Sequence, residues 1–394
     1  MKSANIMINR RVLFDGGMGT QLTARGLAGN CPEMHLVDDF DEVVKIHADY
    51  IAAGATVVTT NTFGANAVKL KKHGLADRAA ELARLGVQAA RKAAGDKALV
   101  AFDMGPTGEL MEPFGTLSCT AAYDAYYQQA QAAQAAGADL AMIETMSSLL
   151  EAKQAALAAH DAGLPFVLSF TFEGNNRTLM GDAPEACAVL AGALGACMLA
   201  TNCSGGPEQM LPIIDAYAQY SSLPLLCEPN AGLPRVVGGI TTFPYSPENM
   251  LDPMRALIAA GADAIGGCCG TTPAHIAAFN TLEFGYKPRP QLAAMICSSR
   301  NVARVSELHD LPRLTLDDAA DYDGDAPAVI IDLSGVDADD ACEQLMDLTS
   351  MIYLPLVFSG DDEAVLKAVL RAYPGAAGVL GHAVLAAECG AVAL

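Results

Sequence analysis

The amino-acid sequence predicts a (β/α)8 TIM barrel followed by a small C-terminal αβ extension. Three observations lead to this prediction. Eight short apolar runs alternate with longer helix-like segments between residues 12 and 285, polar residues gather directly after those runs, and the composition changes after residue 285. A chain of 394 residues is also too long for one small domain and suits one large barrel with an appendage.

The eight apolar runs are the predicted barrel strands. They are apolar throughout instead of alternating with polar residues, as expected for parallel strands that are covered on both faces. In chain order they are Val12–Asp15, Thr56–Thr60, Ala98–Phe102, Leu140–Glu144, Phe166–Phe172, Ala196–Asn202, Leu223–Glu228 and Asp263–Gly267.

Helix-like segments separate these runs and complete the repeated βα unit. They include Ala67–Ala94, Cys119–Ala136, Ser148–Ala162 and Pro247–Ala260. A glycine that can end a helix precedes several of the strands, namely Gly54, Gly137, Gly163 and Gly261. A doubly wound open sheet has the same local pattern, but eight evenly spaced strands favour the barrel.

The tail differs from the barrel in composition, because acidic residues become more frequent after residue 285. Strand-like Val329–Leu333 and Leu354–Phe358 alternate there with helix-like Ala338–Thr349 and Asp361–Arg371. We therefore predict a barrel domain over residues 1–285, and a linker with a small αβ module over residues 286–394.

Charge and composition exclude several classes of partner. The formal net charge is −21, so nucleic acid and anionic membranes are poor partners. The N-terminus has no apolar run of signal-peptide length, and no stretch is long and uncharged enough to span a bilayer. We expect a soluble, cytoplasmic protein. In that reducing compartment, 11 scattered cysteines favour free thiols or metal ligands over a disulfide framework.

Polar residues and thiols follow seven of the predicted strands. Each residue alone could be a turn former or a helix cap, but together they indicate a site, because barrel chemistry lies at the carboxyl ends of the strands. The segments in question are Asp15–Gly17, Thr60–Gly64, Asp103–Gly108, Glu144–Thr145, Asn202–Ser204, Glu228–Asn230 and Cys268–Gly270.

Three thiols in this set predict a metal centre. Cys268 and Cys269 are adjacent at the end of strand eight, among glycines that permit a sharp turn, and Cys203 ends strand six. Three soft thiolates with one open tetrahedral position suit a catalytic zinc ion. The alternative is that these three residues are ordinary buried cysteines. That alternative carries real weight for the other eight cysteines of the chain.

The chain resembles the homocysteine S-methyltransferases, and in particular the homocysteine-binding barrel of cobalamin-dependent methionine synthase. The matching segments are FDGGMGTQL (14–22), TNTFGAN (60–66), MGPTGEL (104–110), IETM (143–146), RTLMG (177–181), NCSGGPE (202–208), EPNAGLP (228–234) and GGCCGTTPAHI (266–276). The resemblance implies that Cys203, Cys268 and Cys269 are catalytic zinc ligands. It also implies that Asp15 and Glu144 bind the amino-acid end of homocysteine, and it marks Asn230 as a further substrate-binding residue.

The resemblance implies methyl transfer to the homocysteine thiol, which gives methionine. It favours methylcobalamin as donor. The chain has no D-x-H-x-x-G cobalamin-ligand pattern, so we expect the corrinoid on a separate protein. S-methylmethionine or betaine is the alternative donor. Two other classes stay open: a non-catalytic zinc- or thiol-binding protein, and a redox protein that uses Cys268 and Cys269 as a dithiol.

The tail resembles the opening of the folate-binding barrel that follows in methionine synthase, most clearly at LPLVFSGDDEAVLKAVLRAYPG (354–375). A whole barrel does not fit in residues 286–394. We expect a shortened module that does not bind folate and that packs on the barrel, a corrinoid partner or a second subunit. The chain could also be a piece of a longer protein.

Overall fold

The computed structural model describes residues 11–27, 29–237 and 240–394. It confirms the predicted fold class. Residues 1–10, for which the sequence predicts no signal peptide, lie outside the described residues. Among the described residues, no helix is both long and apolar enough to cross a membrane.

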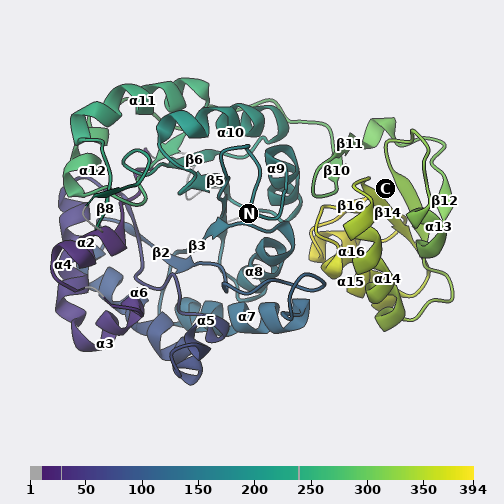
Figure 1. Ribbon diagram of the computed structural model, residues 1–394, viewed down its shortest axis with the longest axis horizontal. Helices are drawn as coiled ribbons and strands as arrows, with labels where there is room; N and C mark the ends of the chain where they lie inside the picture. Colours follow the sequence, from purple (N-terminus) through teal and green to yellow (C-terminus); the bar gives the residue numbers. More distant parts are fainter. Residues whose placement is uncertain (1–10, 28, 238–239) are drawn as a thin grey trace.

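Seven parallel strands form the wall of the barrel, in the order of their sequence (Figure 1). They are β1 (Val57–Thr59), β2 (Leu99–Met104), β3 (Leu140–Met146), β4 (Phe166–Phe170), β5 (Met198–Asn202), β6 (Leu225–Glu228) and β9 (Ala264–Ile265). Seven of the eight predicted runs therefore contain a strand, and most of these strands are shorter than predicted.

The eighth predicted run, Val12–Asp15, closes the wall without forming a named strand. Leu13 makes a parallel bridge with Ile265 of β9, and the Phe14 N–H donates to the Ile265 carbonyl at 2.9 Å. On the other side, the Thr56 N–H donates to the Leu13 carbonyl at 2.8 Å, directly before β1. The segment thus occupies the eighth position of the ring.

Helices surround this wall (Figure 1). They are α2 (Met18–Ala24), α3 (His35–Asp38), α4 (Phe40–Ala52), α5 (Ala67–Lys71), α6 (Ala79–Ala94), α7 (Cys119–Ala135), α8 (Leu149–Asp161), α9 (Pro184–Ala193), α10 (Pro207–Tyr220), α11 (Pro247–Ala260) and α12 (Pro273–Phe279). Short 3-10 turns span Pro32–Met34, Ala76–Arg78 and Val305–Glu307. An antiparallel hairpin, β7 (Arg235–Val237) and β8 (Ile240–Thr242), was not predicted.

Two apolar layers hold the barrel together. The inward layer includes Phe14, Ala101, Met142 and Leu226. The outward layer packs the strands against the helices and is rich in alanine. Residues alternate between the two layers along each strand, because successive side chains of a strand point to opposite faces.

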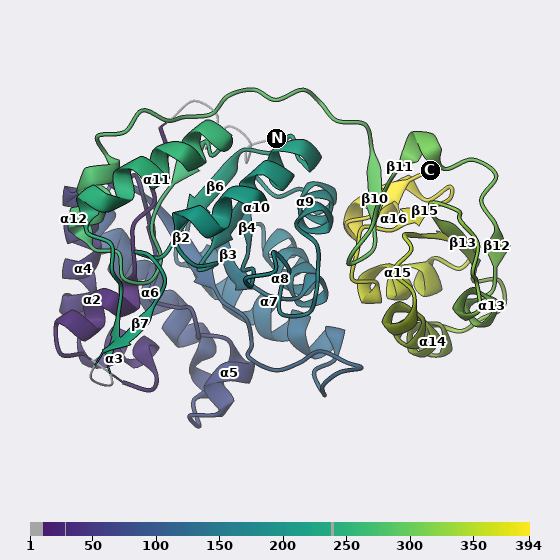
Figure 2. The ribbon, with the colours of Figure 1, turned by 45° about the horizontal axis from the view of Figure 1, so that its top comes forward.

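The C-terminal module is a five-stranded parallel sheet, beside the barrel in both ribbon views (Figures 1 and 2). Its strands are β12 (Arg313–Leu314), β13 (Val329–Asp332), β14 (Leu356–Ser359), β15 (Gly378–Val379) and β16 (Val392–Ala393). Its helices are α13 (Leu316–Ala320), α14 (Ala338–Met351), α15 (Glu363–Ala372) and α16 (Ala383–Glu388). The module therefore contains three more strands than the two predicted.

A hairpin leads from the barrel into this module. Its strands are β10 (Met295–Cys297) and β11 (Val302–Arg304), and Figure 2 shows the long connection that reaches β10 from α12. Ile296 and Ala303 of the hairpin pack with Ala328 and Val357 of the module in a small apolar cluster. The main core of the module is a separate cluster between its sheet and its helices.

Candidate active site

The inward side chains at the strand ends continue the alternation of the barrel core. Ala101 of β2 faces inward, and Asp103 is two residues later. Met142 and Glu144 on β3, Ala200 and Asn202 on β5, and Leu226 and Glu228 on β6 repeat this step. Because the period of a strand is two residues, all four polar side chains point into the mouth of the barrel.

Three thiols converge at this mouth. The sulfur atoms of Cys203, Cys268 and Cys269 all lie within 4.8 Å of one another, and the Cys203 and Cys269 Sγ atoms are 3.8 Å apart. Cys203 has φ +54° and Thr145 at the end of β3 has φ +59°. Such backbone is sparsely populated for residues other than glycine, and it concentrates at functional sites.

Hydrogen bonds fix the turn that carries the two adjacent cysteines. The Thr271 hydroxyl donates to the Cys268 carbonyl at 2.6 Å, and the Gly270 N–H donates to Thr20 Oγ1 at 2.9 Å. Gly270 has φ +81°, and a Cβ atom there would lie 2.2 Å from the Phe243 ring. Glycine is therefore required at this turn.

Two asparagine side chains contact the cysteine residues of this cluster. Asn230 Oδ1 accepts the Cys269 N–H at 3.0 Å, so Asn230 positions the cysteine turn. Its predicted contact with substrate stays a prediction. Asn202 was not predicted as a site residue. Its Nδ2 lies 3.3 Å from Glu144 Oε2 and 3.9 Å from Cys268 Sγ, and its Oδ1 accepts the Thr145 N–H at 2.9 Å.

The thiols of Cys268 and Cys269 differ in the direction of their pKa shifts. Hydrogen bonds from Cys203 and then Cys268 lower the pKa of the Cys269 thiol to about 4. The hydrogen bond with Cys203 leads the causes that raise the pKa of Cys268 well above its usual value. The Cys269 thiolate thus accepts hydrogen bonds from two neighbouring thiols, and such a group of sulfur atoms suits a soft cation.

The two predicted substrate-binding carboxylates lie in the same mouth. Burial raises the pKa of Asp15 to about 7, although Asp15 Oδ2 accepts the Thr59 N–H at 3.0 Å. Burial, followed by the charges of Cys203 and Asp15, raises the pKa of Glu144 to about 8. Neither carboxylate has a salt-bridge partner among the described residues, so a substrate ammonium would relieve an unfavourable arrangement of buried acids.

Two more buried acids complete this group and were missed as site residues. Asp103 and Glu228 are each 4% exposed, and Asp103 Oδ1 and Glu228 Oε2 have no hydrogen-bond partner among the described residues. Burial and then the charge of Glu144 raise the pKa of both. Their inward position in the strand alternation was the signal that could have identified them.

The eight other cysteines lie away from this cluster in the described part of the chain. Cys187, Cys197, Cys227, Cys297 and Cys389 are buried, and Cys31, Cys119 and Cys342 are half-buried. All eleven are free thiols. The structure thus gathers only the three predicted ligands into one group among the residues it describes.

Comparison with known proteins decides the family. The family model described as homocysteine S-methyltransferase matches residues 12–282, which is the barrel. The chain belongs to the homocysteine S-methyltransferase family. Membership in this family agrees with the thiol cluster and the acidic mouth, and it confirms the resemblance seen in the sequence.

Curated relatives within the family are named methionine synthase. The protein from Mycobacterium tuberculosis is 33% identical over 293 residues, and the one from Mycobacterium leprae is 32% identical over 291 residues. These alignments cover 69% and 68% of this chain, but only 24% of each relative. The chain thus spans about a quarter of the length of the curated relatives it matches.

Solved structures show the same fold. The homocysteine methyltransferase MmuM from Escherichia coli in its oxidized form is 28% identical, with a TM-score of 0.58 over 68% of this chain and 95% of that chain. Its metallated form is 27% identical, with a TM-score of 0.57 over 68% of this chain and 94% of that chain. A member of this family has therefore been crystallised with metal bound.

Proposed function

We propose that this protein is a zinc-dependent S-methyltransferase that methylates the thiol of homocysteine and so forms methionine. One observation carries the proposal: three thiols within 4.8 Å of one another lie at the strand ends of the barrel, beside buried carboxylates. The thiols are the donor set that zinc prefers, and three of them leave a fourth position for a substrate sulfur.

Different residues of the site bind the metal, bind the substrate and position the cysteine turn. Cys203, Cys268 and Cys269 would hold the zinc ion, which when bound lowers the pKa of the substrate thiol and keeps its sulfur nucleophilic. Asp15 and Glu144 bind the substrate ammonium and so fix the position of the sulfur. Asn230 and Thr271 hold the backbone of the cysteine turn.

The reaction is a displacement at a methyl carbon. The substrate thiol loses its proton to solvent, its sulfur forms a bond to the methyl carbon, and the bond between that carbon and the donor breaks with its electron pair remaining on the donor. The product thioether carries no negative charge, so it binds a metal more weakly than a thiolate and can leave.

The donor we propose is methylcobalamin bound to a separate corrinoid protein. The resemblance of the sequence to the cobalamin-dependent branch supports this choice. Purified protein with homocysteine is offered methylcobalamin, S-methylmethionine or betaine in separate reactions, and methionine is quantified. Turnover with S-methylmethionine or betaine alone would overturn the choice of donor and leave the thiol chemistry intact.

The metal centre is tested by Cys268→Ala. We expect the variant to lose bound zinc, measured by mass spectrometry of the metal, and to lose at least about 100-fold in methyl transfer, which exceeds the usual effect of an outer-shell change. Cys119→Ala is the matched control, because Cys119 is a half-buried free thiol on α7. A Cys268→Ala protein that keeps both zinc and turnover contradicts the proposal.

A further inference from the structure

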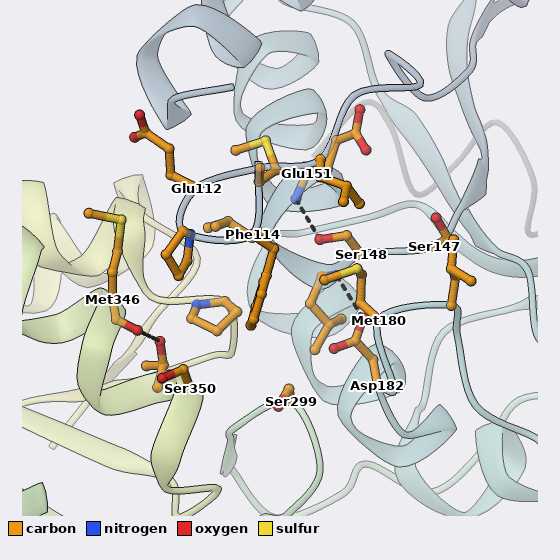
Figure 3. Close-up of a pocket in the computed structure, with 18 of the residues that line it drawn as sticks. Glu112, Phe114, Ser147, Ser148, Glu151, Met180, Asp182, Ser299, Met346 and Ser350 are labelled. Atoms are coloured by element: carbon orange, nitrogen blue, oxygen red, sulfur yellow. Dashed lines mark hydrogen bonds between the residues drawn. The ribbon is translucent and has the colours of Figure 1, made fainter. Parts of the chain in front are cut away.

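A cavity of about 450 Å³ lies between the barrel and the C-terminal module. On the barrel side, the loops after β2, β3 and β4 line it, and on the module side α14 and the segment after α15 do so. Figure 3 shows Phe114 between Met180 and Asp182 of the barrel and Met346 and Ser350 of the module. Its volume is in the range of small-molecule sites.

The two walls of this cavity are held rigidly. Lys153 of α8 is fully buried, and its Nζ donates to the carbonyls of Leu370, Tyr373 and Gly375 at 2.9, 2.7 and 2.8 Å. The Cys297 N–H donates to the Ala376 carbonyl at 2.9 Å. The cavity is therefore a built feature of the junction and not a gap between loosely packed domains.

Large apolar side chains around the cavity are left in solvent. Phe114 is 63% exposed, Leu179 is 68% exposed and Leu110 is 48% exposed, and all three line the cavity. Apolar groups gathered at the rim of a concave site mark a ligand-binding surface more often than scattered ones do. A ligand with an apolar body would remove these side chains from water.

The buried carboxylate of Asp182 is a polar group in the lining of this cavity. Asp182 is 3% exposed, and its Oδ2 accepts the Leu149 N–H at 3.0 Å and the Thr178 hydroxyl at 2.9 Å. Its Oδ1 has no hydrogen-bond partner in the described part of the chain. Burial raises the pKa of Asp182 to about 6, against the lowering effect of its hydrogen bonds with Thr178 and Leu149 and of the charges of Arg300 and Arg177.

The other charged groups around the cavity leave it net negative. Glu109 pairs with Lys72 at 2.8 Å, and Glu151 Oε1 accepts hydrogen bonds from Thr107 and Tyr126. Glu112, Glu151 and Asp182 remain against one cation, Arg300, among the described residues that line the cavity. The Arg300 guanidinium lies 3.7 Å over the Tyr353 ring, so this wall already binds a planar cation of the chain itself.

We propose that this cavity is a second binding site, for a small amine with a flat apolar body. The ammonium pairs with Asp182, and the body packs between Phe114 and Met346. This site differs from the thiol site in its residues, and it takes a ligand without a thiol. Ser147 and Asp182 belong to loops that follow β3 and β4, so an occupant contacts the same face of the barrel that carries the chemistry.

Phenethylamine and 3-phenylpropionate are a matched pair of probes, with the same ring and opposite charge. The chain has no tryptophan, so Phe114→Trp places one fluorophore at the cavity. We expect a saturable emission change with phenethylamine at about 1 mM, the usual range for so small a ligand. The carboxylate probe binds at least about tenfold more weakly, as expected when an ionic hydrogen bond is lost.

Asp182→Asn in the Phe114→Trp background removes the charge, while the amide oxygen can still accept the two hydrogen bonds. We expect at least about a tenfold loss of phenethylamine affinity. Val384→Trp, on an exposed module residue outside the cavity, and Asp317→Asn, at an exposed position of α13, are the controls. Circular dichroism establishes that each variant is folded.

Four results would overturn the proposed amine site. They are equal affinity for the two probes, unchanged affinity in Asp182→Asn, the same emission change in Val384→Trp, or no change up to about 10 mM phenethylamine. All of these measurements are made without homocysteine or a methyl donor. Their failure is therefore separate from any failure of the proposed methyl transfer.

Discussion

Asp15 is a buried acid whose ionisation should control ligand binding in the barrel mouth. Its pKa of about 7 means that the carboxylate charges only as pH rises through neutrality. An amino-acid ammonium stays protonated in this range, so it gains its partner as pH rises.

We therefore expect the dissociation constant of methionine, which has no thiol to titrate, to fall as pH rises from about 6 to about 8. Calorimetric titration measures it. Asp15→Asn should remove the change near pH 7 and move the change that Glu144 supplies to lower pH, because the charge of Asp15 helps to raise the pKa of Glu144. An Asp15→Asn profile equal to that of the wild type would remove Asp15 from ammonium binding.

Asp103 should cost stability when it ionises. Burial raises its pKa above the value of the unfolded chain, so stability falls as pH rises from about 4 through the folded pKa. Asn does not titrate, and Asp103→Asn should be about 1–2 kcal/mol more stable at pH 8, with no gain near pH 4. Urea denaturation at both pH values measures this, and Asp124→Asn, at an exposed position of α7, is the control. A gain of equal size at both pH values would refute the ionic explanation.

Sequence reasoning found the residues that carry a recognisable type of chemistry. The three cysteines, Asp15 and Glu144 all lie at the mouth, although their roles await experiment. Asp103 and Glu228 stood in the same strand-end segments, but nothing in one sequence shows that their oxygens lack partners. Asn202, on β5, was missed because its contacts depend on side chains from β3 and β4 that it meets only in the fold.

At the scale of elements, the main errors have local causes. The predicted helix over Ala67–Ala94 is divided into α5, a 3-10 turn and α6. Gly74 has φ +68° between them, which a continuous helix does not allow. Glycines predicted to end helices do so: Gly54, Gly137, Gly163 and Gly261 all have positive φ. The β7–β8 hairpin was missed because strands of three residues are too short to show a clear apolar pattern.

Gly375 shows how closely β10 approaches the module. A Cβ atom at this position would lie 1.9 Å from the Cys297 carbonyl oxygen. Gly375→Ala should therefore destabilise the protein by about 1–3 kcal/mol, because backbone must shift. Gly360→Ala is the matched control, since its nearest neighbour would be 3.4 Å away, and a change within about 0.5 kcal/mol is expected. Equal urea midpoints for the two variants would contradict this account of the junction.

At the scale of the whole molecule, one side chain joins the barrel to the module. Lys153 places its ammonium at the C-terminal end of α15, where carbonyl groups lack helical partners. Lys153→Met should weaken docking by about 2–4 kcal/mol, because three buried carbonyls lose their donor.

Differential scanning calorimetry measures this effect. We expect one transition for the wild type and two for Lys153→Met, as the module unfolds before the barrel. Lys367→Met on the exposed face of α15 is the control, because Lys367 pairs with Glu388 at the surface, and such pairs contribute little to stability. A single unshifted transition in Lys153→Met would show that the junction does not depend on this lysine.

The hairpin of β10 and β11 has a consequence for how the chain can be divided. In a complete barrel, the inward face of a strand is covered by strands from the opposite wall. Here Ile296 and Ala303, from the segment that leads in from the barrel, cover part of the module sheet instead. A fragment that begins after residue 304 would leave Val357 exposed to solvent. If the boundary of a fragment were chosen from the helices and strands of the module alone, the fragment would expose this apolar surface and aggregate.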